Sequence, residues 1–196
     1  MQIDFPKFTG LRCLMMPYVQ GEPDSVPATY APYATIIASV FLNRGDIGFL
    51  TIDESVATGG KPHRGKRAKF SRALHTEAGR HRGANLWGGN WGDSETVTLD
   101  EGVEILLANN LDYSCAIWSA VHKDTSRDGD IGHLAELYPY SEAELMKAGE
   151  VRRIGIFTPH ESLPVRSTVE RQFLRIVGSG VHGREPYFTV NPILPA

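Results

Sequence analysis

The chain has 196 residues, of which 41% are hydrophobic and 22% are charged. This is the composition of one ordinary folded domain, and it argues against a disordered or membrane-spanning class of protein. The formal net charge of -3 disfavours a general nucleic-acid coat, because binding to the phosphate backbone depends on many Lys and Arg side chains. The two cysteines lack Cys-x-x-Cys spacing, and we see neither a secretory signal nor an apolar run of ~20 residues, so we expect a cytoplasmic protein without membrane contact.

The N-terminal part of the chain is rich in proline. Residues 1–33 contain five prolines, which favour an extended arm or edge segment over a helix. The apolar segment 33–42 fits either a strand or one or two buried helical turns, and 47–52 reads as a strand. We expect a single domain over 1–196, with its core in 47–190.

Two further apolar segments lie in the middle of the chain. Residues 103–108 and 113–118 read as strands, and the intervening Asn109-Asn110 favours a turn. This pattern predicts a hairpin or meander.

The C-terminal part combines one predicted helix with several strands. An amphipathic pattern predicts a helix over 131–146, broken at Pro139, with Ser141 as an N-cap and Glu144 three residues on. The predicted strands that follow are 151–157, 171–177 and 187–190. Many short strands with Gly and Pro between them indicate a mainly β sandwich or barrel, and we favour a jelly roll with one or two short helices.

Two separated histidine motifs suggest a metal site. His75-Thr76-Glu77 lies in the middle of the chain, and His160 follows an apolar segment 85 residues later, between Pro159 and Pro164. Two imidazoles and one carboxylate can hold iron(II) on one face and leave coordination positions open. The plain alternatives are a polar loop at His75 and a histidine at position 160 that bonds only to the backbone.

These motifs resemble the iron(II)/2-oxoglutarate-dependent oxygenases, which are built on a double-stranded β-helix. That family has a His-x-Asp or His-x-Glu motif at an early core strand, a second His on a late strand, and a downstream Arg. His75, Glu77 and His160 match in order, and Arg171 lies 11 residues after His160. The resemblance covers roughly residues 47–177 and implies Fe(II) bound by the first three residues, with 2-oxoglutarate as cosubstrate.

The proximal ligand pair has a competitor. His-x-Glu is the less usual form in that family, and His122-Lys123-Asp124 offers the usual His-x-Asp directly after a predicted strand. However, only 38 residues separate His122 from His160, and they must hold the predicted helix and the return strands. We therefore favour His75 and Glu77 over His122 and Asp124.

The resemblance also implies a role for an arginine. Arg171 would pair with the distal carboxylate of 2-oxoglutarate, since a planar guanidinium can donate two parallel hydrogen bonds. Arg175 lies on the same strand face and is a second candidate. An ordinary ion pair of Arg171 with Glu170 is the structural alternative.

A basic segment surrounds the first motif. Residues 61–82 contain eight Lys or Arg residues and one acid, Glu77, so we expect a small-molecule or anionic substrate nearby; nucleic acid is the less favoured partner. Trp87 and Trp91, among glycines, would form either a substrate-covering loop or packing anchors.

Other catalytic patterns are absent from the sequence. It contains neither a Gly-x-Ser-x-Gly elbow nor a Walker loop, and Cys115 reads as core. The alternatives to a 2-oxoglutarate oxygenase are a cupin-type metalloenzyme without 2-oxoglutarate and a non-enzymatic jelly-roll binding or structural module.

Overall fold

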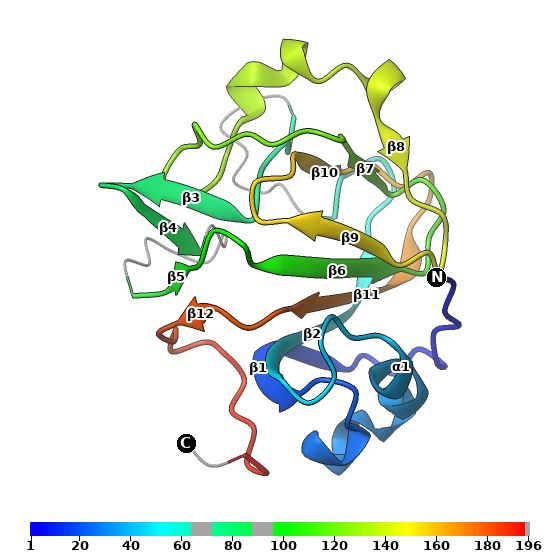
Figure 1. Ribbon diagram of the computed structural model, residues 1–196. Helices are drawn as coiled ribbons and strands as arrows, with labels where there is room; N and C mark the ends of the chain where they lie inside the picture. The colour runs from blue at the N-terminus through cyan, green and yellow to red at the C-terminus, as the bar shows by residue number, and fades with distance from the viewer. Residues whose placement is uncertain (64–71, 88–95, 195–196) are drawn as a thin grey trace.

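The computed structural model describes residues 1–63, 72–87 and 96–194. The chain is mainly β, with several antiparallel sheets and a few short helices (Figure 1). The predicted mainly β class is therefore confirmed.

The largest sheet has five antiparallel strands in the order β1-β2-β11-β6-β9. In that order the strands are Arg12–Val19, Ile47–Ala57, Val169–Val177, Glu104–Asn109 and Arg152–Gly155. The Pro-rich N-terminal segment thus supplies the edge strand β1, and the predicted strands at 47–52, 151–157 and 171–177 correspond to β2, β9 and β11.

Two smaller sheets complete the β structure. A three-stranded sheet, β10-β7-β8, lies above the five-stranded sheet in Figure 1; its strands are His160–Ser162, Cys115–Ile117 and Glu144–Leu145. A four-stranded sheet, β12-β5-β4-β3, lies to one side; its strands are Val181–His182, Thr98–Leu99, Ala84–Trp87 and Ala78–His81.

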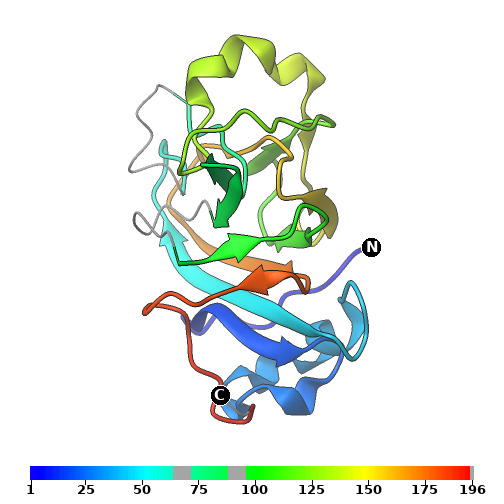
Figure 2. The same ribbon diagram turned by 60° about the vertical axis from the view of Figure 1, so that its left-hand side comes forward.

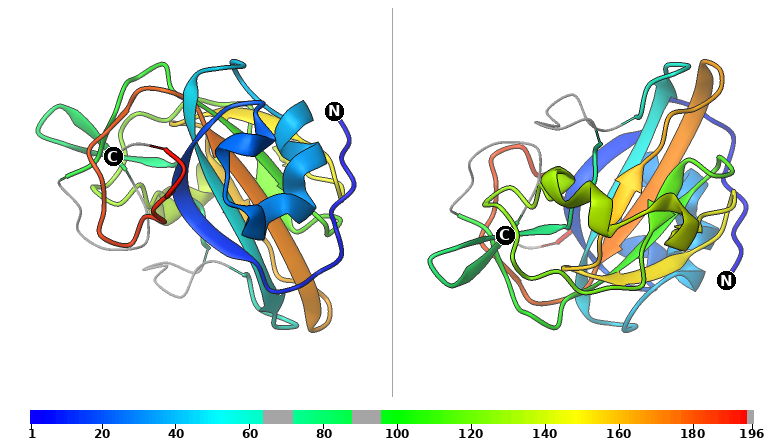
Figure 3. Two further views of the ribbon diagram at one scale, coloured as in Figure 1. Left: turned by 90° about the horizontal axis from the view of Figure 1, so that it is seen from below. Right: turned by 90° about the horizontal axis from the view of Figure 1, so that it is seen from above.

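The helices are short and lie on the two outer sides of the sheets. α1 spans Ala34–Ser39, and the 3-10 helices are η1 (Pro23–Ser25), η2 (Ala28–Tyr33), η3 (Gly132–Leu137) and η4 (Tyr140–Glu142). Figure 3 shows α1 and its neighbouring turns across the lower side, and η3 and η4 across the upper side. For residues 33–42, the helical alternative is the one that forms.

Alternation along β2 and β11 divides the five-stranded sheet into two faces, because successive side chains point to opposite sides of a strand. Leu50, Ile52, Leu174 and Ile176 face outward and pack in one cluster with Tyr33 and the α1 residues Ile36 and Ile37. The opposite face carries Thr51, Asp53, Ser55, Arg171, Phe173 and Arg175. This inner face, which is unusually polar for a sheet interior, turns toward the three-stranded sheet.

The predicted helix over 131–146 is wrong. Only the short 3-10 helices η3 and η4 form, and residues 144–145 become β8. Pro139 separates the two helices, since it cannot donate a backbone hydrogen bond, and its carbonyl accepts from Trp118 Nε1 at 3.0 Å. Pairing of Leu145 with Ala116 of β7 then draws the chain into an extended form.

The predicted hairpin of 103–108 with 113–118 is also wrong. β6 already pairs with β11 on one edge and β9 on the other, so neither edge is left for β7. The Asn109 side chain directs the chain away, because its Oδ1 accepts hydrogen bonds from Leu111 N at 2.9 Å and Ser114 Oγ at 2.7 Å. β7 therefore joins the second sheet.

The predicted strand at 187–190 does not form. Thr189 instead exchanges two hydrogen bonds with Leu14, one of them through its side-chain hydroxyl. Leu14 lies where the register between β1 and β2 shifts, and such an irregular position offers no continuous ladder to a further strand.

A buried carboxylate ties the N-terminal segment to the outer face of the sheet. Glu54 Oε2 accepts from the backbone N of Thr9 and Leu11, while Oε1 accepts from Tyr33 Oη at 2.8 Å and Gln172 Nε2 at 2.9 Å. Burial alone would raise the pKa of Glu54, but these hydrogen bonds outweigh it and hold the pKa below its usual 4.5.

Replacing this carboxylate should have a pH-dependent cost. Because the folded state lowers the pKa of Glu54, its ionised form stabilises the protein above the unfolded pKa, and this stabilisation is lost as pH falls through the folded pKa. We expect Glu54→Gln to lower the free energy of unfolding by about 1–3 kcal/mol at pH 7, measured by urea denaturation, and by less at pH 3. Asp46→Asn, at an exposed carboxylate, is the control. An equal loss at both pH values would contradict this assignment.

Candidate metal centre

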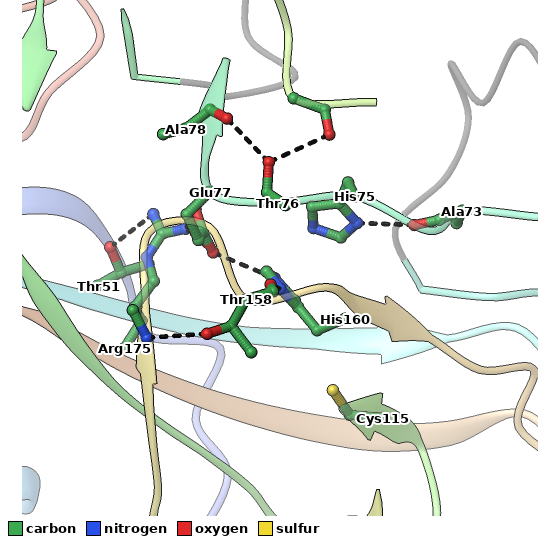
Figure 4. A network of polar contacts seen from close by, with 12 residues as sticks. Thr51, Ala73, His75, Thr76, Glu77, Ala78, Cys115, Thr158, His160 and Arg175 are labelled. Atoms are coloured by element: carbon green, nitrogen blue, oxygen red, sulfur yellow. Dashed lines mark hydrogen bonds and ion pairs between the residues drawn. The ribbon is translucent and has the colours of Figure 1, made fainter. Parts of the chain in front are cut away.

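The two histidines of the separated motifs lie side by side. His75 is in the segment before β3, and His160 begins β10; the backbone N of each donates to the carbonyl oxygen of the other at 3.0 Å. Residues directly opposite in an antiparallel bridge point their side chains to the same side. The two rings accordingly lie with centroids 4.3 Å apart (Figure 4).

Backbone carbonyls determine which ring nitrogen of each histidine carries hydrogen. His75 Nδ1 lies 2.7 Å from the carbonyl oxygen of Ala73, and His160 Nδ1 lies 2.9 Å from that of Thr158. Because a carbonyl oxygen can only accept, Nδ1 is the donor in both rings. In the neutral imidazole Nε2 then carries the lone pair, which is the arrangement that a metal-binding histidine needs.

Glu77 completes the group. It lies two residues after His75, and its carboxylate lies on the same side as the two rings (Figure 4). Glu77 is buried, and its Oε1 lies 3.6 Å from His160 Nε2. One ligand atom from each of His75, Glu77 and His160 lies within 4.8 Å of the other two, so this group could hold a metal ion.

Thr76, between His75 and Glu77, holds the ligand segment in place. Thr76 Oγ1 donates to the carbonyl oxygen of Ala78 at 2.8 Å, and Thr76 N donates to that of Gly129 at 2.9 Å. A Cβ at Gly129 would lie 2.4 Å from the Thr76 carbonyl oxygen, and the φ of Gly129 is +76°. Only glycine therefore fits where this loop crosses the ligand segment.

Arg175 contacts the carboxylate of the group. Its NH1 lies 3.1 Å from Glu77 Oε1 and 3.0 Å from Oε2, and its NH2 lies 3.4 Å from Thr51 Oγ1. The guanidinium is 4.6 Å from the centre of the Trp87 ring, and the residue is only 1% exposed. The sequence suggested Arg175 as a second candidate for binding 2-oxoglutarate. In the structure its guanidinium contacts Glu77, one of the predicted metal ligands.

Arg171 lies farther along the same face of β11. It is buried, it is opposite Ser55 of β2, and its guanidinium lies 4.9 Å from the Phe173 ring centre. Its charge acts on the neighbouring Cys115, whose sulfur points toward the side on which His160 lies (Figure 4). Burial raises the pKa of the Cys115 thiol to about 11 despite the lowering effect of Arg171, so Cys115 is a neutral thiol near pH 7. A role of Arg171 in binding 2-oxoglutarate remains a prediction.

The rival pair does not join the group. His122 Nδ1 is 2.8 Å from Tyr138 Oη, and its Nε2 is 3.0 Å from the carbonyl oxygen of Asp124. The chain has already left β7 at Ile117, which carries these residues away from the inner face. Among the described residues, the metal-ligating group includes neither His122 nor Asp124.

A second polar cluster went unrecognised in the sequence. His63 Nε2 is 3.1 Å from Asp53 Oδ2 and 3.2 Å from Ser55 Oγ, and Arg12 Nε is 2.9 Å from Asp53 Oδ1. The detectable signal was Asp53 and Ser55 at alternate positions of one strand, with a histidine soon after it. Since Asp53 and Ser55 approach the same ring nitrogen, this is not the arrangement of a Ser-His-Asp triad.

Arg72, from the basic segment, is a structural clamp. Its Nε and NH2 lie 2.9 Å and 2.7 Å from Glu161 Oε2, and its NH1 donates to the carbonyl oxygens of Ala135 and Tyr138. The guanidinium also lies 4.2 Å from the Tyr140 ring centre. This network fastens η3 and η4 to β10.

The rest of the basic segment is only partly described. Arg80 and Arg82 are exposed, and the basic residues at 64, 66, 67 and 69 lie outside the described residues. Trp87 is buried against Arg175, which agrees with the packing alternative, and Trp91 lies outside the described residues.

Comparisons with family models, curated proteins and solved structures gave no match. In the described part of the chain, no helix has both the length and the apolar character needed to cross a bilayer.

Proposed function

We propose that the protein is a mononuclear iron(II)/2-oxoglutarate-dependent oxygenase. The observation that carries the proposal is the convergence of His75, Glu77 and His160 on one buried point from segments far apart in the sequence. Two nitrogen donors and one carboxylate suit divalent iron and leave coordination positions open. The backbone bonds of both Nδ1 atoms support this fit, since they leave the lone pair of each neutral ring on Nε2, and Nε2 of His160 lies 3.6 Å from Glu77 Oε1.

The order of strand pairing supports a double-stranded β-helix, the fold of the resembling family. Taking the bridged His75 segment as the second of eight core strands, four nested pairs form: first with eighth (β2–β11), second with seventh (His75–His160), third with sixth (β6–β9) and fourth with fifth (β7–β8). The pairs β11–β6 and β10–β7 join these into two sheets; β2 (cyan) and β11 (orange) of the larger one cross the middle of Figure 2. Such nested antiparallel pairing is what a jelly roll requires.

In this proposal each residue of the site has a separate task. His75, Glu77 and His160 would hold Fe(II), which supplies positions for O2 and for the 2-oxo acid. Arg171 would donate to the distal carboxylate of 2-oxoglutarate, because it is a buried guanidinium on the same inner face.

The substrate proposed is an anionic small molecule. Exposed Arg80 and Arg82 support this choice, since they lie on β3 and its turn, directly after the ligand segment. Both cysteines are free thiols, which agrees with the reducing cytoplasm as the proposed compartment.

Anaerobic titration tests the proposal. Adding iron(II) and 2-oxoglutarate to the protein should produce the visible charge-transfer band of the chelate, and exposure to O2 should then release succinate. Metal binding without either signal would favour the cupin-type enzyme that lacks 2-oxoglutarate. Absence of metal binding would favour the non-enzymatic module, in which Arg175 alone compensates Glu77.

A further inference from the structure

The carboxylate of the metal group already has a full positive charge beside it. Arg175 NH1 contacts both oxygens of Glu77, and both side chains are almost completely buried. Arg175 also carries its charge at any pH in which the protein is folded, since guanidinium does not deprotonate in proteins. The pair is therefore neutral before any metal arrives.

The neighbouring acid is compensated as well. Glu161, adjacent to His160, pairs with Arg72 at 2.7 Å. The imidazoles of His75 and His160 are neutral when they act as ligands. Glu77 and Glu161 are thus each paired with an arginine, so neither carboxylate offers an uncompensated negative charge to a divalent cation.

We propose that Arg175 makes metal binding depend on a doubly charged anion. A divalent ion would add two positive charges to a buried, already neutral site, and an unbalanced charge in such an environment is costly. A chelating dianion offsets two positive charges and a monoanion only one. Because buried Arg171 adds a further positive charge on the same face, the dianion leaves the smaller excess charge. The inference rests on the proposed function and adds to it that the charge of the cosubstrate is selected through Glu77 by Arg175, a positioning residue.

Thermodynamic linkage makes the effect measurable without turnover. If a dianion strengthens metal binding, the metal strengthens dianion binding by the same factor, and couplings of this kind are typically about 5- to 150-fold. Oxalate and its monoamide, oxamate, have nearly the same shape but carry two charges and one charge. Their comparison isolates charge from chelation.

The experiment measures the dissociation constant of Mn(II) by electron paramagnetic resonance, with no anion, with oxalate and with oxamate. For each anion, the Mn(II) dissociation constant without the anion is divided by the constant with it. This ratio is then corrected for the affinity of the same anion for aqueous Mn(II). In wild type we expect oxalate to strengthen Mn(II) binding at least about tenfold more than oxamate. In Arg175→Met the preference should fall below about threefold, and in Arg175→Lys, which keeps the charge, it should persist.

Controls separate this role from a structural one. Arg153→Met removes an exposed arginine from β9 and should keep the wild-type preference. If Arg175→Met fails to fold, the wild-type and Arg175→Lys ratios still decide. Equal effects of oxalate and oxamate in wild type, or an undiminished preference in folded Arg175→Met, would overturn the inference alone. Failure of wild type to bind Mn(II) even with oxalate present would overturn the metal site itself.

Discussion

Replacing His160 with alanine is expected to abolish specific metal binding. His160 supplies one of only two nitrogen donors in the group, and its ring is oriented by the bond from Nδ1 to the Thr158 carbonyl oxygen. Changing a group that merely hydrogen-bonds to a metal ligand typically costs about 10- to 100-fold in affinity. Loss of the ligand itself should exceed that range. Equilibrium dialysis with Mn(II) in the presence of oxalate, followed by metal analysis, measures the effect.

The matched control is His122→Ala. His122 belongs to the rival His-x-Asp motif, but its ring contacts Tyr138 and the Asp124 carbonyl instead of the metal group. This variant should bind one Mn(II) with wild-type affinity. If metal binding is lost in His122→Ala and retained in His160→Ala, the placement of the site is wrong.

Replacing Glu161 with alanine should give the largest loss of stability. The change leaves the Arg72 guanidinium partly buried without its carboxylate, and breaking a buried ion pair from one side costs about 3–5 kcal/mol. It also removes the bond from Ala73 N to Glu161 Oε1, which holds the segment preceding His75 against β10. We therefore expect a lower free energy of unfolding in urea and a roughly 10- to 100-fold weaker affinity for Mn(II).

Glu104→Ala is the comparison for this variant. Glu104 pairs with Arg153, but that arginine side chain is 62% exposed, and exposed ion pairs contribute at most about 1 kcal/mol. A Glu161→Ala protein no less stable than Glu104→Ala would show that Arg72 does not act as a clamp. Unchanged Mn(II) affinity would show that the clamp does not position the ligands.

The accuracy of the sequence predictions depended on whether the deciding interactions were local. β2 and β11 were predictable because β-branched and aromatic residues recur along them, and β9 because it lies within the predicted strand 151–157, which contains Val151, Ile154 and Ile156. The helix over 131–146 was not, since its pattern resembled a helix while Pro139 and pairing with β7 determined the outcome. The hairpin failed for a similar reason, because both edges of β6 are occupied by strands distant in the sequence.

For the candidate site as well, the sequence predicted what depends on local spacing and missed what depends on contacts between distant parts of the chain. The spacing of His75 and Glu77 places them on one face of any extended segment, and residue type alone then suggests a metal. The sequence suggested Arg175 only as a second candidate for binding 2-oxoglutarate and did not single out Arg72, since the contacts of both arginines arise from burial against Glu77 and Glu161. The Asp53–His63 contact likewise depends on how the chain returns after β2.

The metal centre is tested by diffraction from crystals soaked in Mn(II) and oxalate, recorded at a wavelength where manganese scatters anomalously. We expect one strong anomalous peak per chain, within bonding distance of Nε2 of His75, Nε2 of His160 and a carboxylate oxygen of Glu77. A peak at another group of side chains, or an empty site at saturating Mn(II) and oxalate in solution and in the crystal, would show that these residues do not form a metal centre.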